Sequence, residues 1–125
     1  RVAQHAAIAA LAGGFQDDFA SVGQMRAEYD KRRRFLVKSF NDLGLTCFEP
    51  RGAFYAFPSV EATGLTGEEF VERLLKEEQV AVVPGNAFGE CGDYHVRCSC
   101  ATGMRELQEA VARIARFTEK LRKNR

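Results

Sequence analysis

The sequence predicts a small α/β (α+β) domain in which helices pack on a mixed β-sheet, preceded by a long helix. Apolar residues recur at helical spacing in 17–43, 66–79 and 103–121, with short β-prone segments between these helices. Turn and capping signals separate the elements. A chain of 125 residues, 46% hydrophobic and 28% charged, is long enough to bury one core.

The first two elements are expected to be helices. Residues 1–12 include six alanines and therefore have a high helix propensity, and the glycine pair at 13–14 predicts the end of this helix. A second helix is expected over about 17–43, with Gly44 after its last turn. Its apolar stripe consists of Met25, Tyr29, Leu36, Phe40 and Leu43.

Two strands, a helix, two more strands and a last helix are expected along the rest of the chain. The β-prone segments are 45–48, 53–57, 80–83 and 94–100. Thr66 and Glu69 form a capping box that opens a helix ending near Gln79. That helix is expected to bury Phe70, Val71, Leu74 and Leu75. The last helix, about 103–121, is expected to present Met104, Leu107, Val111, Ile114 and Leu121 on one face.

The charge pattern argues against nucleic-acid and membrane partners. Eighteen basic and seventeen acidic residues leave a net charge of +1, which gives no strong field around the molecule. The basic run at 31–34 occupies one turn of a helix and indicates a solvated face. No apolar run reaches the ~20 residues of a membrane span. The first residues lack a signal-peptide layout and an initiator Met, so we expect a cytoplasmic protein and a fragment of a longer chain.

The four cysteines are expected to be reduced thiols. Cys91, His95, Cys98 and Cys100 offer four potential zinc ligands within ten residues. Structural zinc sites use C-x₂₋₄-C spacings, whereas a C-x-C pair on a strand has no turn between its sulfurs. We therefore expect no metal site.

Segment 94–100 carries the most informative side chain, Arg97. Alternation along a strand puts Val96, Cys98 and Cys100 on one face and His95, Arg97 and Ser99 on the other. An arginine in mid-strand is costly without a partner, and its planar fork suits a carboxylate. On spacing alone, an internal arginine–acid pair or an exposed sheet edge is favoured over a ligand site.

Three motifs together resemble the C-terminal part of a class I/II aminotransferase, a fold-type-I, pyridoxal-phosphate (PLP) enzyme related to aspartate aminotransferase. The motifs are RGAFYAFP at 51–58, VAVVPGNAFG at 80–89 and VRCS at 96–99. Their order and spacing match the family, and the resemblance covers essentially the whole chain. It implies that 1–16 is a helix from the end of a large domain, 17–44 a connecting helix and 45–125 the C-terminal small domain.

The same resemblance implies a reaction and a site. The full-length protein would move an amino group between an amino acid and a 2-oxo acid, with Arg97 binding the substrate carboxylate and the ring of Phe54 near the substrate. The lysine that carries PLP is expected upstream of this chain, so we expect no catalytic or cofactor-binding residue here and no activity of the chain alone. The full-length enzyme is expected to be a homodimer.

A second hypothesis needs no cofactor. A stand-alone α/β module could use Arg97 to bind a small carboxylate ligand without catalysis.

Overall fold

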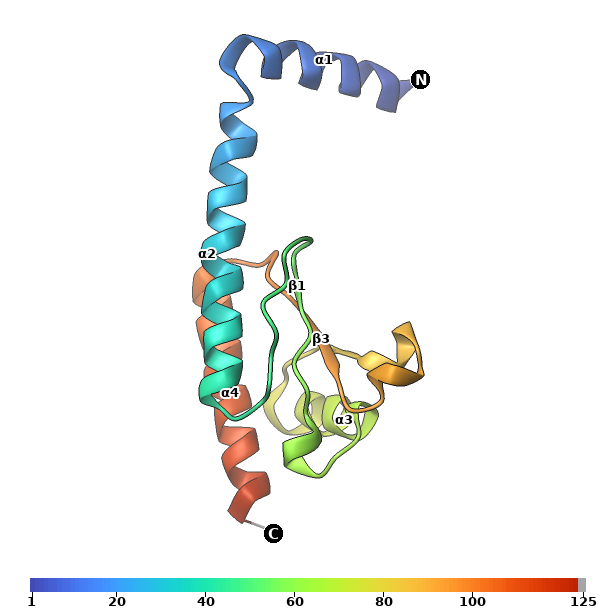
Figure 1. The fold of residues 1–125 in the computed structure, drawn as a ribbon, viewed down its shortest axis with the longest axis vertical. Helices are drawn as coiled ribbons and strands as arrows, with labels where there is room; N and C mark the ends of the chain where they lie inside the picture. The colour runs from blue at the N-terminus through green and yellow to red at the C-terminus, as the bar shows by residue number, and fades with distance from the viewer. Residues whose placement is uncertain (124–125) are drawn as a thin grey trace. The chain divides into compact units, whose positions relative to one another are not determined.

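The computed structural model describes residues 1–123, and its chain divides into two compact units, Arg1–Lys31 and Arg32–Arg125 (Figure 1). The helices are α1 (Val2–Asp17), α2 (Ala20–Asp42), α3 (Gly67–Glu78) and α4 (Met104–Lys123). The strands are β1 (Tyr55–Ala56), β2 (Val83–Pro84) and β3 (Val96–Ser99). Three short 3₁₀ helices are η1 (Glu61–Thr63), η2 (Gly85–Phe88) and η3 (Glu90–Gly92).

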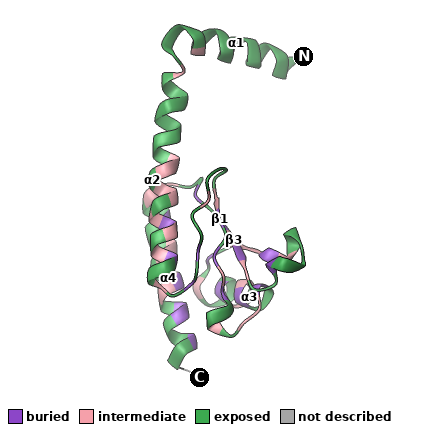
Figure 2. Cartoon of the chain, viewed as in Figure 1, coloured by how far each residue is buried: buried purple, intermediate pink, exposed green. Residues whose placement is uncertain are grey.

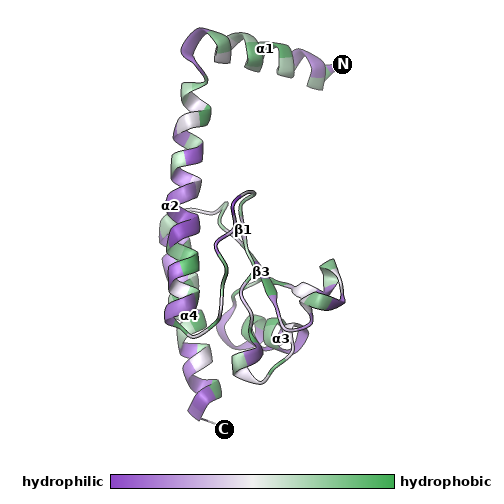
Figure 3. Cartoon of the chain, viewed as in Figure 1, coloured by the Kyte–Doolittle hydropathy of each residue, from purple (hydrophilic) through white to green (hydrophobic). Residues whose placement is uncertain are grey.

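The first unit contains α1 and the beginning of α2. The expected end of the first helix at Gly13-Gly14 is wrong, because α1 continues to Asp17 and Asp18 follows it in the left-handed conformation, with φ 53°. Each glycine costs about 1 kcal/mol within a helix, a penalty that the surrounding alanines offset. No residue of α1 is buried, and nearly all of this helix has the colour of exposed residues (Figure 2). Figure 3 shows apolar stretches along the same helix.

In the second unit, the end of α2 contributes two residues to the core. Leu36 is 3% exposed and Phe40 is 1% exposed. The expected apolar stripe does not extend to Met25, which is 54% exposed. Gly44 follows the helix with φ +73°, a conformation that favours glycine, as expected for the residue after the last turn.

The sheet has the order β1-β3-β2, and both pairings are antiparallel. The sheet is therefore antiparallel and not mixed as expected. The reason is that β3 lies between β1 and β2 and runs opposite to both. Strands β1 and β3 are shorter than the β-prone segments that contain them, and β2 shares only Val83 with the expected segment 80–83. Segment 45–48 is extended without joining the ladder, although the Ser59 amide donates to the Thr46 carbonyl at 2.8 Å.

The core of this unit is centred on the contact between α3 and α4. The rings of Phe70 and Phe117 meet edge to face, 5.2 Å between centroids, and both are 1% exposed or less. The Thr66–Glu69 capping box is present as predicted. Leu75, expected in the core, is 50% exposed, whereas Leu74 beside it is fully buried. Adjacent helix positions are about 100° apart, so one of the two must face outward.

Most of the expected core residues of α4 are buried. These are Leu107, Ile114 and Leu121, joined by Phe117 and Thr118, which the sequence pattern did not single out. None of the helices in residues 1–123 combines the length and the hydropathy that a membrane-spanning helix needs.

Candidate functional site

Arg97 lies in the middle of β3, the central strand of the sheet. Its direct neighbour on β2 is Val83. The alternation predicted for this strand is observed, because the opposite face buries Val96, Cys98 and Cys100 at 2%, 6% and 1% exposure. Arg97 itself is half-buried. The strand therefore fixes the backbone of this arginine over a packed core and turns its side chain to the other face.

Two aromatic rings flank the guanidinium group. Its carbon Cζ lies 4.4 Å from the ring centroid of Tyr55 and 4.4 Å from that of Phe88. Tyr55 belongs to β1 and Phe88 ends η2, directly after β2, so the two rings come from opposite edges of the sheet. A cation at this distance from a ring is attracted by the electron density of the ring face.

Among the described residues, no carboxylate forms an ion pair with Arg97. The arginines of the same unit that do form pairs include Arg33 with Glu49 and Arg116 with Glu78, each at 2.7 Å. The internal arginine–acid pair that sequence spacing favoured is thus not part of the described structure. A half-buried guanidinium held between rings presents N–H donors that suit a carboxylate ligand.

Phe54, the other residue expected at the site, lies beside Tyr55, with ring centroids 4.7 Å apart. Phe54 is 42% exposed, and its carbonyl accepts a hydrogen bond from the Cys100 amide at 2.9 Å. Sequence reasoning did not identify Tyr55 or Phe88 as neighbours of Arg97. The alternation of Tyr55 and Phe57 in the β-prone segment 53–57 carried a partial signal, but the pairing of Tyr55 with Ser99 depends on register.

The turn that carries Phe88 is held tightly against the sheet. The Gly85 amide donates to the His95 carbonyl at 2.8 Å. A Cβ at Gly85 would lie 2.4 Å from the Gly92 carbonyl oxygen, which leaves no room for a side chain. Asn86 also donates to Glu68 of α3 at 2.8 Å. These contacts fix the backbone from which Phe88 projects, although its ring is 52% exposed.

The cysteines lie in different environments. Burial raises the pKa of the Cys98 thiol to about 12, and the neighbouring Cys47 raises it further. Burial also raises the pKa of Cys47 and of Cys100, while Cys91 is exposed. No group of three potential metal-ligating side chains occurs in the part of the chain that the structure describes.

The five lysines of the chain are all exposed. They are Lys31, Lys38, Lys76, Lys120 and Lys123. Lys38 pairs with Asp42 and Lys120 with Glu77 on the surface. A lysine that forms a Schiff base is activated by an apolar pocket or by an adjacent cation. All five of these lysines are exposed, so burial does not activate any of them in this chain.

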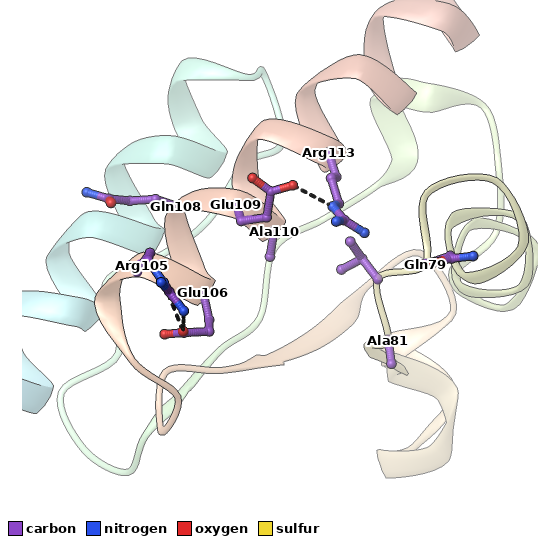
Figure 4. Close-up of a pocket in the computed structure, with 9 residues that line it drawn as sticks. Gln79, Ala81, Arg105, Glu106, Gln108, Glu109, Ala110 and Arg113 are labelled. Atoms are coloured by element: carbon purple, nitrogen blue, oxygen red, sulfur yellow. Dashed lines mark hydrogen bonds and ion pairs between the residues drawn. The ribbon is translucent and has the colours of Figure 1, made fainter.

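A hollow of about 740 Å³ lies away from Arg97, between the start of α4 and residues 79–81 (Figure 4). Its charged side chains already pair with each other. Arg113 contacts Glu109 at 2.8 Å, and Arg105 contacts Glu106 at 3.2 Å. These two arginines of the hollow thus have acidic partners, whereas Arg97 has none among the described residues.

Comparisons with known proteins agree on one family. The family model described as aminotransferase class I and II matches residues 1–114. The chain is 47% identical over 119 residues to the putative aminotransferase YugH of Bacillus subtilis, covering 95% of this chain and 30% of that protein. It is also 47% identical over 111 residues to an aspartate aminotransferase of Pyrococcus abyssi, covering 89% of this chain and 28% of that protein.

Solved structures give the same result. An aromatic aminotransferase from Pyrococcus horikoshii OT3 superposes with a TM-score of 0.80 at 47% identity, over 82% of this chain and 27% of that one. A Thermus thermophilus aspartate aminotransferase mutant superposes with a TM-score of 0.82 at 36% identity, over 92% of this chain and 31% of that one. The chain thus spans less than a third of the length of these proteins.

Proposed function

The chain belongs to the class I and II aminotransferases, and we propose that it forms the C-terminal part of such an enzyme, where Arg97 binds the carboxylate of the substrate. The proposed reaction moves an amino group from an amino acid to a 2-oxo acid. Both substrates carry a carboxylate next to the reacting carbon. One cationic group that recognises this carboxylate can therefore serve both halves of the reaction.

The observation that supports this role is the environment of Arg97. The guanidinium is half-buried, lies 4.4 Å from two ring centroids, and forms no ion pair with a carboxylate in residues 1–123. A cation that is partly removed from water gains more from an anionic partner than an exposed one does. Two charge-assisted hydrogen bonds from the fork would fix both the position and the orientation of the bound acid.

Enzymes of this family generally use PLP, which supplies an electron sink for reactions at the carbon that bears the amino group. The residues of this chain do not fit a PLP site by themselves, because all five lysines are exposed. We propose that the cofactor-binding lysine lies in a part of the enzyme outside this chain, and that this chain alone is inactive. Within the enzyme, the task of this chain is to bind and orient the substrate acid.

The role of Phe54, the oligomeric state and the cellular location are proposed from membership of the family. We propose Phe54, through its contact with Tyr55, as part of the wall beside the bound substrate. We also propose that the complete enzyme is a homodimer in the cytoplasm. Sedimentation of the complete enzyme tests the dimer, and a monomer at working concentration would contradict it.

The function is tested with the protein produced from the full reading frame that contains this chain. The protein is loaded with PLP and assayed against a panel of amino acids paired with 2-oxo acids. We expect transfer of the amino group for at least one pair. A protein that transfers none, yet binds simple carboxylates such as pyruvate through Arg97, would instead support the stand-alone carboxylate-binding module.

A further inference from the structure

We propose that Tyr55 and Phe88 are positioning residues that hold the guanidinium of Arg97 between their rings and aim its N–H edge at the substrate carboxylate. This inference rests on the proposed role of Arg97. The inference adds that two aromatic rings set the orientation of the Arg97 guanidinium. In many proteins an acidic side chain has this role for a partly buried arginine.

The distances support a clamp with two sides. The Cζ atom of Arg97 lies 4.4 Å from each ring centroid, which is well within the range of a cation–π contact. The rings belong to segments on the two flanks of β3, so the guanidinium has a ring contact from each side of its strand. Stacking occupies the faces of the planar group and leaves its N–H donors at the edge.

The contrast with Arg73 separates this arrangement from ordinary packing. The Arg73 guanidinium also lies over a ring, that of Phe117, at the longer distance of 5.6 Å. There the ring is fully buried in the core and Arg73 is paired with Glu77 at 3.1 Å. Phe117 thus has a packing role without Arg73, and Arg73 has an acidic partner.

Burial is incomplete for the rings beside Arg97, although Tyr55 also contacts Phe54 and Phe88 also contacts Phe57, at 4.7 Å and 6.4 Å between centroids. Phe88 is 52% exposed, and Tyr55 is only half-buried. Even so, the turn that carries Phe88 is fixed by the close approach of Gly85 and Gly92 and by the hydrogen bond between Asn86 and Glu68. A rigid backbone beneath a half-exposed ring is what a positioning role requires, because a mobile ring would not restrict the arginine.

The first test measures steady-state kinetics of the complete PLP-loaded enzyme with Tyr55→Leu and Phe88→Leu. Each change keeps an apolar side chain and removes the ring. We expect KM for the amino acid to rise about tenfold, with a smaller change in kcat, because the carboxylate meets a less ordered donor. The conservative variants Tyr55→Phe and Phe88→Tyr keep the rings and are expected to restore KM to within about twofold of the original value.

The matched control is Phe48→Leu, which removes the ring of a residue that is 84% exposed and that makes no cation–π contact with Arg97 in residues 1–123. It should leave KM unchanged. Melting temperatures of all variants show that the proteins are folded. An unchanged KM in both leucine variants would overturn the clamp, and so would a Tyr55→Phe variant as impaired as Tyr55→Leu, since that result assigns the effect to the hydroxyl.

A second readout does not depend on activity. In enzyme labelled with ¹⁵N-arginine, NMR measures the rotation of the Arg97 guanidinium about its Nε–Cζ bond. We expect slow rotation in the original protein and faster rotation in both leucine variants. If rotation accelerates while Arg97→Lys leaves kcat/KM unchanged, the rings restrict the guanidinium, but the carboxylate role fails and the proposed positioning of the substrate fails with it. If Arg97→Lys lowers kcat/KM but neither rotation nor KM responds to the leucine variants, the clamp is overturned.

Discussion

The side chain of Asn41 makes two hydrogen bonds with the backbone of Cys47. Its amide donates to the Cys47 carbonyl at 2.9 Å, and its oxygen accepts from the Cys47 amide at 3.0 Å. Cys47 lies in the extended segment that leaves α2 and runs beside the sheet, and it is 5% exposed. The side-chain amide of Asn41 therefore provides hydrogen-bond partners for the amide and the carbonyl of Cys47, which would otherwise be buried without partners.

Replacement of Asn41 should destabilise the fold. Asn41→Ala leaves two backbone groups unpaired, and we expect the free energy of unfolding to fall by about 1–3 kcal/mol. Asn41→Asp should also destabilise, because a carboxylate oxygen would face the Cys47 carbonyl. Urea unfolding measures both. Lys38→Ala, which removes an exposed pair with Asp42, is the control and should change little. Equal stability of Asn41→Ala and the original protein would contradict this account.

The start of α3 provides a local test. Thr66 accepts from the Glu69 amide at 3.3 Å, and the Glu69 carboxylate accepts from the Thr66 amide at 2.8 Å. Thr66→Ala removes the cap and should lower the free energy of unfolding by about 1 kcal/mol. Thr66→Ser keeps the hydroxyl and should retain most of that stability. Thermal unfolding distinguishes them, and the cap has no such role if the two variants melt together.

The buried thiols predict a fall in stability at high pH. The pKa of Cys98 is raised from 9.0 to about 12, so the folded protein keeps this proton at a pH where the unfolded chain releases it. Unfolding therefore releases a proton between these values, and stability falls as pH rises, by at most about 1.4 kcal/mol per pH unit from this group. The measurement is urea unfolding at about pH 8 and about pH 10.5.

Cys98→Ala is the matched variant for that experiment. The variant should lower the free energy of unfolding at both pH values, because it leaves a cavity. It should also reduce the loss of stability between about pH 8 and about pH 10.5. An identical difference in the two proteins would show that Cys98 does not contribute to the pH dependence.

Local signals in the sequence predicted the helices well. The capping box of Thr66 and Glu69 depends only on residues three positions apart, and α3 begins there as expected. Alternation along 94–100 likewise predicted which face of β3 is buried. Both patterns lie within a single element, so neighbouring residues determine them.

Features set by contacts between elements were harder to predict. The end of α1 was missed because alanine propensity offsets two glycines. The antiparallel sheet depends on the position of β3 between its neighbours, which no segment encodes alone. Arg97 was identified, but its contacts with Tyr55 and Phe88 were not, because they depend on strand register and on the turn after β2.

The most direct test of the central claim is kcat/KM for Arg97→Lys in the complete enzyme. Lysine keeps the charge but loses the fork, so we expect kcat/KM for amino acids to fall about 30- to 5000-fold, the equivalent of about 2–5 kcal/mol. Cofactor binding should be nearly unchanged, and an amine without a carboxylate should be affected much less. An unchanged kcat/KM with a lower melting temperature would contradict the claim and assign Arg97 a structural role.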